Sequence, residues 1–306
     1  MSVDNNTKIK VYTKPPLPFD GNKKLWYKNY KEILKEFGDV EIFVDLFGGS
    51  GILSHWTKNI YKNAIVIYND FDNYRERLNN IPTTNELMAD LHNILKDVPT
   101  RKFIDNEHNN QIKLLFEQYK NNNKFIDLKT LSHQLHFSRR VNVNTNDINN
   151  FLKDKLYNNI NKNNIEYDGK YLDGINVVSM DWRKLYNYCR ETFKEYKICF
   201  ILDPPYLYMD KSQYNCRYWK LKDSIELLDI LKHYPFIFFN SSKSGFKELV
   251  DIINRIFDIG ITYKFIQQNM VSIYEKRMDY CMYSNKNYFK EIITTLLKYA
   301  KTEESI

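Results

Sequence analysis

Short apolar runs alternate along the chain with stretches in which the apolar positions follow helical spacing. Five runs are rich in apolar or β-branched residues, have the length of strands and end near an acid, a glycine or a serine. They are residues 40–47 (VEIFVDLF), 64–72 (AIVIYNDFD), 175–181 (INVVSMD), 197–203 (KICFILD) and 235–242 (PFIFFNSS). Such continuous runs are typical of parallel strands buried on both faces. VSIYEKR and DYCMYSN, within residues 271–285, predict a closing antiparallel hairpin.

The pattern changes between residues 91 and 170, where Asn and Lys are frequent and the periodicity is helical. This segment is interpreted as an insertion. Strands that alternate with helices predict an α/β fold with a Rossmann-like, doubly wound and mostly parallel sheet. We therefore expect one sheet domain from residues 1–90 and 171–306, and a mainly helical inserted domain from 91–170. Ligands of such sheets bind beyond the carboxyl ends of the strands.

The composition permits a large core and a polyanionic partner. The chain has 306 residues, 43% hydrophobic and 15% aromatic, with a net charge of +7. Basic and aromatic residues suit a nucleic acid, but abundant Lys, Asn, Ile and Tyr would also follow from an AT-rich coding sequence. No apolar stretch reaches the roughly 20 residues that cross a bilayer, and MSVDNNTKIK lacks the apolar core of a signal peptide. We expect no membrane partner and a cytoplasmic location.

Cysteine and histidine show no pattern of a metal site. The four cysteines lie apart with no CxxC spacing, so we expect reduced thiols. His133 and His136 could share a helical face, but no cysteine or carboxylate ligand lies near them in the sequence. No metal is expected.

A glycine-rich stretch follows the first predicted strand. FVDLFGGSG, residues 43–51, places Asp45 near the strand end and then Gly48, Gly49 and Gly51 before a helical pattern. Glycines let a ligand approach the backbone where a Cβ would block it. The stretch fits neither GxxxxGK[ST] nor GxGxxG, which disfavours ATP hydrolysis and dinucleotide binding. A nucleoside site is predicted, with a ligand-free tight turn as the alternative.

Two further acids stand at predicted strand ends. Asp70 follows the second run, where a carboxylate can accept hydrogen bonds from ribose hydroxyls. Asp70 or its neighbour Asp72 could equally cap a helix. Asp181 could accept from an adenine amino group, or it could be the N-cap of the helix that begins at Trp182.

The run that ends at Asp203 continues into Pro204, Pro205 and Tyr206. Proline has no backbone donor, so this strand end presents only acceptors: the Asp203 carboxylate and the carbonyls near Pro204. Two acceptors that hold the hydrogens of an amino group favour a pyramidal nitrogen whose lone pair can attack an electrophile. Tyr206 could stack on a flat base, which would have to be flipped out of a duplex. A plain proline turn is the alternative.

With FVDLFGGSG ahead of LDPPY, the chain resembles the bacterial and phage DNA adenine N6-methyltransferases that depend on S-adenosylmethionine. PPLPFDGNKKLW, residues 15–26, is similar to the family's leading motif, although the family commonly has adjacent glycines and one lysine. The resemblance covers residues 15–90 and 170 to about 285. It implies that the sheet domain is catalytic, that residues 91–170 recognise the target, and that the protein acts in the cytoplasm of a bacterium or phage-infected host.

The resemblance also implies roles for individual residues. Asp203, Pro204, Pro205 and Tyr206 would form the catalytic tetrapeptide. The residues that would bind S-adenosylmethionine are Phe19, Gly21, Lys23, Lys24, Asp45, Phe47, Gly48, Gly49, Gly51, Asp70, Phe71, Asp181, Trp182 and Asp203. Among these, Asp45 and Gly48 would line the methionine end, Asp70 the ribose and Asp181 the adenine. Which of Lys23 and Lys24 faces the cofactor is left open.

Double-stranded DNA is the implied partner, bound by a monomer or a weak dimer. Arg139 and Arg140 offer donors for phosphates and guanine edges, although a solvated helix face is equally compatible with them. Lys211, Arg217 and Lys220, in the basic and aromatic stretch after the tetrapeptide, are predicted to contact phosphate.

Other activities stay open. Methylation of RNA adenine or of DNA cytosine N4 uses similar chemistry, and DPPY in place of SPPY favours adenine by resemblance. A non-catalytic DNA-binding protein could retain the fold, although it would have no physical reason to keep the acceptors and glycines. A dehydrogenase is disfavoured by the glycine pattern and by the lack of an identifiable catalytic His or Tyr-Lys pair.

Overall fold

The chain forms two compact units. The computed structural model describes residues 11–21, 23–137, 148–153, 155–160, 163–205, 219, 221–241, 262–271 and 276–284. The helical unit takes its described residues from 1–22 and 72–173, and the sheet unit takes its own from 23–71, 174–211 and 216–306. The helical unit thus begins before residue 91, because one continuous helix, α4, runs across that position from Ile81 to Ile94.

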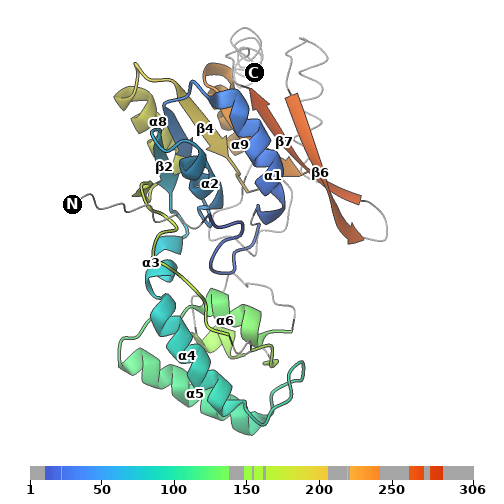
Figure 1. Ribbon diagram of the computed structural model, residues 1–306. Helices are drawn as coiled ribbons and strands as arrows, with labels where there is room; N and C mark the ends of the chain where they lie inside the picture. Colours follow the sequence, from blue (N-terminus) through green and yellow to red (C-terminus); the bar gives the residue numbers. More distant parts are fainter. Residues whose placement is uncertain are drawn as a thin grey trace, which may run out of the picture. The chain divides into compact units, whose positions relative to one another are not determined.

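The sheet unit is built on a sheet whose described part has seven strands in the order β3-β2-β1-β4-β5-β7-β6 (Figure 1). β1 to β5 pair in parallel, whereas β7 is antiparallel to both β5 and β6. This confirms the predicted α/β, Rossmann-like and mostly parallel fold with a C-terminal antiparallel hairpin. The strands are β1 (Ile42–Asp45), β2 (Ile65–Asn69), β3 (Asn176–Val178), β4 (Ile198–Leu202), β5 (Phe236–Ser241), β6 (Thr262–Val271) and β7 (Lys276–Ser284). The helices of this unit are η1 (Lys24–Trp26), α1 (Tyr27–Leu34), η2 (Lys35–Phe37), α2 (Ile52–Ile60), α8 (Trp182–Thr192) and α9 (Leu221–His233).

Helices cover both faces of the sheet, as a doubly wound fold requires. Successive strand side chains point to opposite faces, so Phe200 and Phe238 pack with the apolar residues of α8 and α9. Phe239 faces the other way and meets the ring of Tyr30 from α1 at 5.9 Å. Tyr30 in turn lies 5.8 Å from the ring of Trp56 in α2. The core therefore has two layers, one on each side of strands that are buried on both faces.

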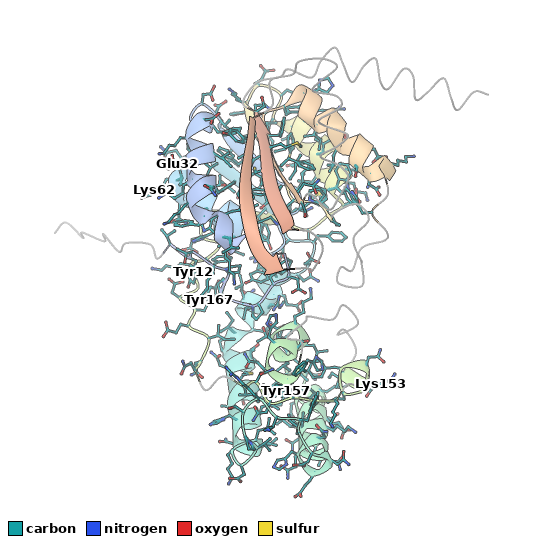
Figure 2. All side chains as sticks on the ribbon, turned by 90° about the vertical axis from the view of Figure 1, so that its right-hand side faces the viewer. Tyr12, Glu32, Lys62, Lys153, Tyr157 and Tyr167 are labelled. Carbon is teal, nitrogen blue, oxygen red and sulfur yellow. The ribbon has the colours of Figure 1, made fainter. Side chains whose placement is uncertain are left out.

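The hairpin differs from the prediction in the place of its first strand (Figure 2). β6 spans Thr262–Val271 and β7 begins at Lys276, so the expectation that VSIYEKR forms one strand is wrong. β6 lies at the edge of the sheet, and its sequence, TYKFIQQNMV, is interrupted by Lys, Gln and Asn. Edge strands tolerate and often need such polar residues, because continuous apolar edges aggregate. β6 therefore lacks the apolar run that identifies the buried strands.

The order of the strands creates a point at which the chain changes direction across the sheet. From β1 the chain proceeds to β2 and β3 on one side, and it then returns to β4 on the other side of β1. α2, which follows β1, and α9, which follows β4, pack on opposite faces of the sheet, and ligands of such sheets bind beyond the carboxyl ends of these strands. Asp45 closes β1 and pairs in register with Ile201 of β4, two residues before Asp203.

The helical unit has its own core. It comprises α3 (Tyr74–Asn79), α4 (Ile81–Ile94), α5 (Asn106–Asn121), α6 (Leu128–Leu135) and α7 (Ile148–Phe151). Leu91, Phe116, Leu131 and Phe151 are among the buried residues that hold these helices together. The side chains of Asp105 and Asp127 cap α5 and α6 by accepting backbone N–H groups. The inserted region is therefore mainly helical, as predicted.

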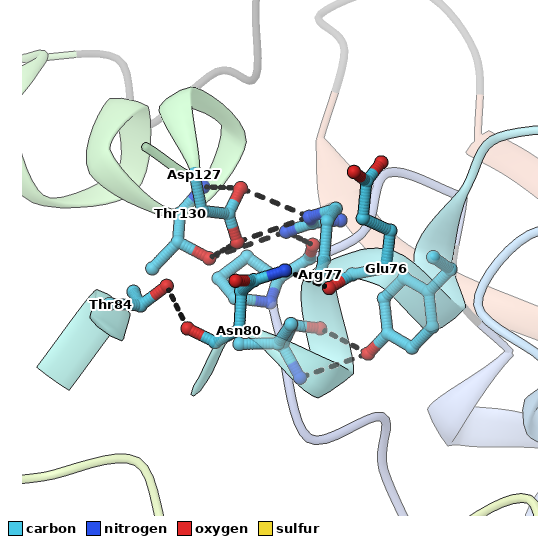
Figure 3. A network of polar contacts seen from close by, with 9 residues as sticks. Glu76, Arg77, Asn80, Thr84, Asp127 and Thr130 are labelled. Atoms are coloured by element: carbon cyan, nitrogen blue, oxygen red, sulfur yellow. Dashed lines mark hydrogen bonds and ion pairs between the residues drawn. The ribbon is translucent and has the colours of Figure 1, made fainter. Parts of the chain in front are cut away.

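A buried ion pair ties three parts of the helical unit together (Figure 3). Arg77 Nε donates to both carboxylate oxygens of Asp127, at 3.0 and 3.1 Å, and Arg77 Nη2 donates to the Pro18 carbonyl at 3.0 Å. Asp127 also accepts from the backbone N–H and the hydroxyl of Thr130. The segment that contains Pro18 is thereby joined to α3 and α6.

In the part of the chain that the structure describes, no helix combines the length and hydropathy needed to span a bilayer.

Candidate active site

Asp203 and Lys23 form an ion pair directly beyond the end of β4. Lys23 Nζ donates to Asp203 Oδ2, and the two side chains are only 9% and 19% exposed. Pro204 and Pro205 follow Asp203 and contribute no backbone donors. The lysine compensates the charge of the carboxylate, and a carboxylate offers more acceptor positions than the one that Lys23 occupies. The predicted acceptor at this strand end is therefore present in the structure.

The same contact distinguishes the two neighbouring lysines. Lys23 is buried, whereas Lys24 begins η1 and is exposed. Sequence reasoning could not choose between them, because both follow the same glycine at nearly the same spacing. The contact with Asp203 assigns Lys23 to the carboxyl edge of the sheet.

Asp45, at the end of β1, is completely buried. Ser54 Oγ donates to its Oδ2 at 2.8 Å, but Oδ1 has no hydrogen-bond partner among the described residues. Burial raises the pKa of Asp45 to about 7; the hydrogen bond from Ser54 opposes this rise and the negative charge of Asp203 adds to it. A buried acceptor oxygen without a donor is costly, so this site fits a ligand that brings a positively charged donor.

The glycines after β1 are required by packing and by the turn itself. A Cβ on Gly48 would lie 2.1 Å from Cδ2 of Tyr68 in β2, so the ring occupies the space that a side chain would need. Gly49 and Gly51 have φ angles of +49° and +71°, which L-residues with side chains rarely adopt. Sequence reasoning attributed these glycines to ligand approach, whereas the structure shows that Gly48 is needed for close contact between the turn and β2.

Tyr68 links this turn to Asp70. Its hydroxyl lies 2.7 Å from the carbonyl oxygen of Gly49 and 2.9 Å from Asp70 Oδ1, so it can donate to either. Asp70 is buried and follows β2 directly, and Phe71 beside it is 54% exposed. A carboxylate next to an exposed ring is compatible with a ribose and its base, which was the predicted use of this strand end.

Asn69 is a site-building residue that sequence reasoning missed. Its Nδ2 donates to the carbonyls of Leu46 and Met180 at 3.0 and 2.9 Å, and its Oδ1 accepts from the Met180 N–H at 3.0 Å. The buried amide thus joins the segments that follow β1 and β3 at the end of β2. The sequence signal that could have identified Asn69 is an amide at the end of an apolar run, directly before Asp70.

Asp181 is the N-cap of α8, the structural alternative that the sequence left open. Its side chain accepts from the Arg183 N–H at 2.9 Å. The side chain is 47% exposed, and its contact with a cofactor adenine stays a prediction. The ring of Trp182 lies 5.7 Å from that of Phe47 and 6.3 Å from that of Trp219, so these aromatic residues share one cluster.

Of the remaining predicted residues, two belong to the helical unit and six lie outside the described part of the chain. Phe19 and Gly21 belong to the helical unit, where the Phe19 ring meets the ring of Tyr74 at 5.8 Å and the amine of Lys129 at 5.8 Å. Their roles in cofactor binding stay predictions. Six predicted residues lie outside the described part of the chain: Tyr206 of the tetrapeptide and the nucleic-acid candidates Arg139, Arg140, Lys211, Arg217 and Lys220.

Comparison with known proteins identifies the family. No protein-family model matches the chain. A protein of Haemophilus influenzae named "Putative methyltransferase" is 35% identical over 243 residues, which span 78% of this chain and 79% of the relative. Identity of that extent over most of both chains, on a Rossmann-like sheet with acids at its carboxyl edge, shows that the chain belongs to this family of methyltransferases.

Proposed function

We propose that the protein methylates the exocyclic N6 amine of adenine in double-stranded DNA, with S-adenosylmethionine as the methyl donor. The observation that carries the proposal is the Asp203 carboxylate beyond the end of β4, compensated by buried Lys23 and followed by two prolines without backbone donors. This arrangement supports an amine as the methyl acceptor. The Asp203 carboxylate and the neighbouring carbonyl are two acceptors, which suit the two hydrogens of an NH2 group better than the single hydrogen of a hydroxyl or a thiol.

The chain's own groups can prepare such an amine for attack. Asp203 and the carbonyl of Pro204 would each accept one amine hydrogen, which draws the nitrogen lone pair out of conjugation with the ring. A nitrogen held in this way would form the new N–C bond as the S–C bond of the methyl donor breaks, and its surplus proton would leave for solvent. Because the nitrogen would attack the methyl group directly, no covalent intermediate on the protein is needed. Lys23 would keep Asp203 charge-compensated throughout. S-adenosylmethionine, when bound, supplies an electrophilic methyl group on a sulfonium.

The residues around β1 and β2 fit this cofactor. The unpartnered Oδ1 of Asp45 suits the ammonium of the methionine portion. Asp70 lies where a ribose hydroxyl could be bound, and exposed Phe71 offers a flat apolar surface to an adenine. The uses of Asp45 and Asp70 follow the roles implied by the resemblance to DNA adenine N6-methyltransferases, which gave the cofactor adenine to Asp181.

DNA is favoured as the substrate by the resemblance of FVDLFGGSG and LDPPY to that family, and by the net charge of +7. DPPY in place of SPPY favours adenine over cytosine. RNA adenine and DNA cytosine N4 remain the rival substrates of the same chemistry.

Transfer of a labelled methyl group tests the proposal. The protein is incubated with methyl-labelled S-adenosylmethionine and, separately, with mixed-sequence unmethylated duplex DNA, single-stranded DNA and RNA, and the digested nucleosides are separated. We expect label in N6-methyldeoxyadenosine from the duplex. Label in N4-methyldeoxycytidine or in RNA adenosine would assign a rival substrate, and no label in any nucleic acid would contradict the proposal.

The variant Asp203→Ala provides the matching structural test. It should abolish transfer, because the amine loses its charged acceptor, while the Kd for S-adenosylmethionine measured by calorimetry changes by no more than about threefold. Full activity of Asp203→Ala would remove the observation on which the proposal rests.

A further inference from the structure

Two exposed aromatic side chains and one half-buried aromatic side chain of the helical unit lie together. Phe103 and Phe137 expose 50% and 67% of their surface, and their rings are stacked at 6.1 Å. The ring of Tyr157 meets both of them edge-on, at 5.1 and 5.0 Å. We name these three residues the aromatic patch. Clustered exposed rings leave apolar area in water that a partner could cover, so they mark an interaction site.

The aromatic patch is held by backbone hydrogen bonds. Phe103 and Tyr157 form an antiparallel bridge, and the Tyr157 N–H donates to the Leu135 carbonyl at 2.8 Å. The Tyr157 hydroxyl also donates to the Arg101 carbonyl at 2.6 Å. Beneath the patch, Leu135 belongs to the buried core of the unit. Tyr157, against which both other rings pack, is therefore preorganised, and little of its side-chain entropy is lost when a partner binds.

One cation contacts the aromatic patch, and further exposed cations lie close to it in the sequence. Lys155 Nζ lies 4.6 Å from the centre of the Phe103 ring, and Arg101, Lys102 and Lys153 are also exposed (Tyr157 and Lys153 are labelled in Figure 2). The acids are fewer. Asp105 is hydrogen-bonded by the N–H and the ring of His108 at the start of α5. The other acid close to these cations in the sequence is Asp154, which stands between Lys153 and Lys155. The surroundings favour a polyanion.

A cavity of about 360 Å³ adjoins the aromatic patch and is lined by groups that can read base edges. Arg101, His133, Gln134 and Asn159 are among its lining residues. Asn159 Nδ2 donates to the carbonyl of His136, the neighbour of Phe137, which places the cavity beside the patch. Arginine pairs with guanine edges and amide side chains pair with adenine edges. Rings and base-reading groups therefore lie side by side.

We propose that the aromatic patch is a base-stacking surface for double-stranded DNA, with Lys155 contacting a nearby phosphate. Apolar rings that insert between two base pairs stack on the bases there. This stacking stabilises the duplex while a neighbouring base is unstacked. A second copy of this chain is a less suitable occupant. A symmetric contact would place the four cations of one copy opposite the same four cations of the other, and like charges repel. The inference rests on the proposed function, since it requires that the substrate be DNA.

DNA binding by the full-length protein without cofactor tests the inference. The anisotropy of a labelled mixed-sequence duplex is measured at several salt concentrations for the wild type, Phe103→Ala/Phe137→Ala, Lys155→Gln and the control Tyr188→Ala, whose ring is 52% exposed on α8 of the sheet unit. The double variant should bind roughly tenfold more weakly at every salt concentration, because stacking is lost. Lys155→Gln should reduce the slope of log K against log salt by about 0.9, the value for one phosphate contact. Tyr188→Ala should bind as the wild type does, and all variants should retain the wild-type Tm and affinity for S-adenosylmethionine.

The outcomes separate the two proposals. If the wild type methylates duplex DNA and the double variant binds that duplex equally well, the inference is overturned and the proposed function stands. If the double variant instead shifts the sedimentation of the protein without changing DNA affinity, the patch joins copies of the chain and the inference is overturned. If the wild type neither binds nor methylates nucleic acid, the proposed function fails and this inference fails with it.

Discussion

At the scale of residues, two carboxylates at the carboxyl ends of neighbouring strands differ because their neighbours differ. Asp203 has a lysine in direct contact, whereas Asp45 accepts a hydrogen bond from the neutral hydroxyl of Ser54. Asp203 is therefore suited to remain an acceptor for a neutral amine. Asp45 lacks a full counter-charge in contact and is suited to a cationic ligand.

Replacing each neighbouring lysine separately tests the role of Lys23. Lys23→Met should lower kcat at saturating cofactor by about tenfold to a hundredfold, because Asp203 loses the cation that compensates it. Lys24→Met removes the same charge from an exposed position and should leave kcat unchanged. Single-turnover methyl transfer, with Tm as a check on folding, measures both. Equal effects of the two variants would contradict the assignment of Lys23.

The raised pKa of Asp45 predicts a pH dependence of stability. A carboxyl group whose pKa is about 7 when folded and near its ordinary value when unfolded holds its proton more tightly in the folded state. Its contribution to stability is complete below pH about 4 and is lost as the pH rises through about 7. Asp45→Asn cannot ionise, so its Tm relative to the wild type should rise from pH 5 to pH 8. A constant difference in Tm over that range would argue against a buried, protonatable Asp45.

Cofactor binding should show the opposite trend. If Asp45 accepts the ammonium of S-adenosylmethionine, it must ionise, so the wild-type affinity measured by calorimetry should increase with pH up to about 7. In Asp45→Asn the affinity should be weaker and should vary less with pH.

At the scale of elements, the turn after β1 is shaped by its contact with β2. The Tyr68 ring fills the space beside Gly48, and the Asn69 amide ties the segments beyond β1 and β3 together. The strand ends are therefore fixed by hydrogen bonds and close packing within the sheet unit. The glycine-rich turn has a defined shape without any ligand contact.

Two Gly→Ala variants test this account. Gly48→Ala should cost about 1–3 kcal/mol of stability or more, because the new methyl group would overlap the Tyr68 ring. Gly38→Ala is the control: it has a φ of −64° and nothing within 4 Å of its added Cβ, so it should be neutral or stabilise by up to about 1 kcal/mol. Urea unfolding of both variants measures the difference. A neutral Gly48→Ala would show that the turn can move away from β2.

At the scale of the whole molecule, each compact unit has its own core and its own internal ties. In the helical unit, Arg77 and Asp127 are almost completely buried and connect α3, α6 and the segment around Pro18. Such a pair is costly to break, because the remaining charge is buried without its partner.

Arg77→Leu should therefore destabilise the helical unit by about 3–5 kcal/mol. Hydrogen exchange should accelerate in α3 and α6 while the amides of β1 and β4 keep their protection, since those strands belong to the other core. Lys124→Leu, which removes the exposed ion pair with Glu86, is the control and should cost less than about 1 kcal/mol. Loss of protection in both units of Arg77→Leu would show that they unfold together.

Much of the fold could be predicted from sequence, but less of the site. The buried strands were found because continuous apolar runs are a local signal, whereas β6 was misplaced because an edge strand does not need such a run. The start of the helical unit was placed too late, because the change in composition near residue 91 falls within α4. Asn69 was overlooked because its importance depends on Leu46 and Met180, which are distant in the sequence.

The sequence by itself determined the buried parallel strands, the acids and glycines that follow them, and the two prolines after Asp203, because each depends on periodicity or on the chemistry of adjacent residues. The tertiary structure alone decided that Lys23 rather than Lys24 meets Asp203, 180 residues away, that Tyr68 fills the space beside Gly48, and that Asp181 caps α8. The physical reason is that strand order and register bring distant residues together, and no local pattern records which of two neighbouring side chains will be buried by that contact.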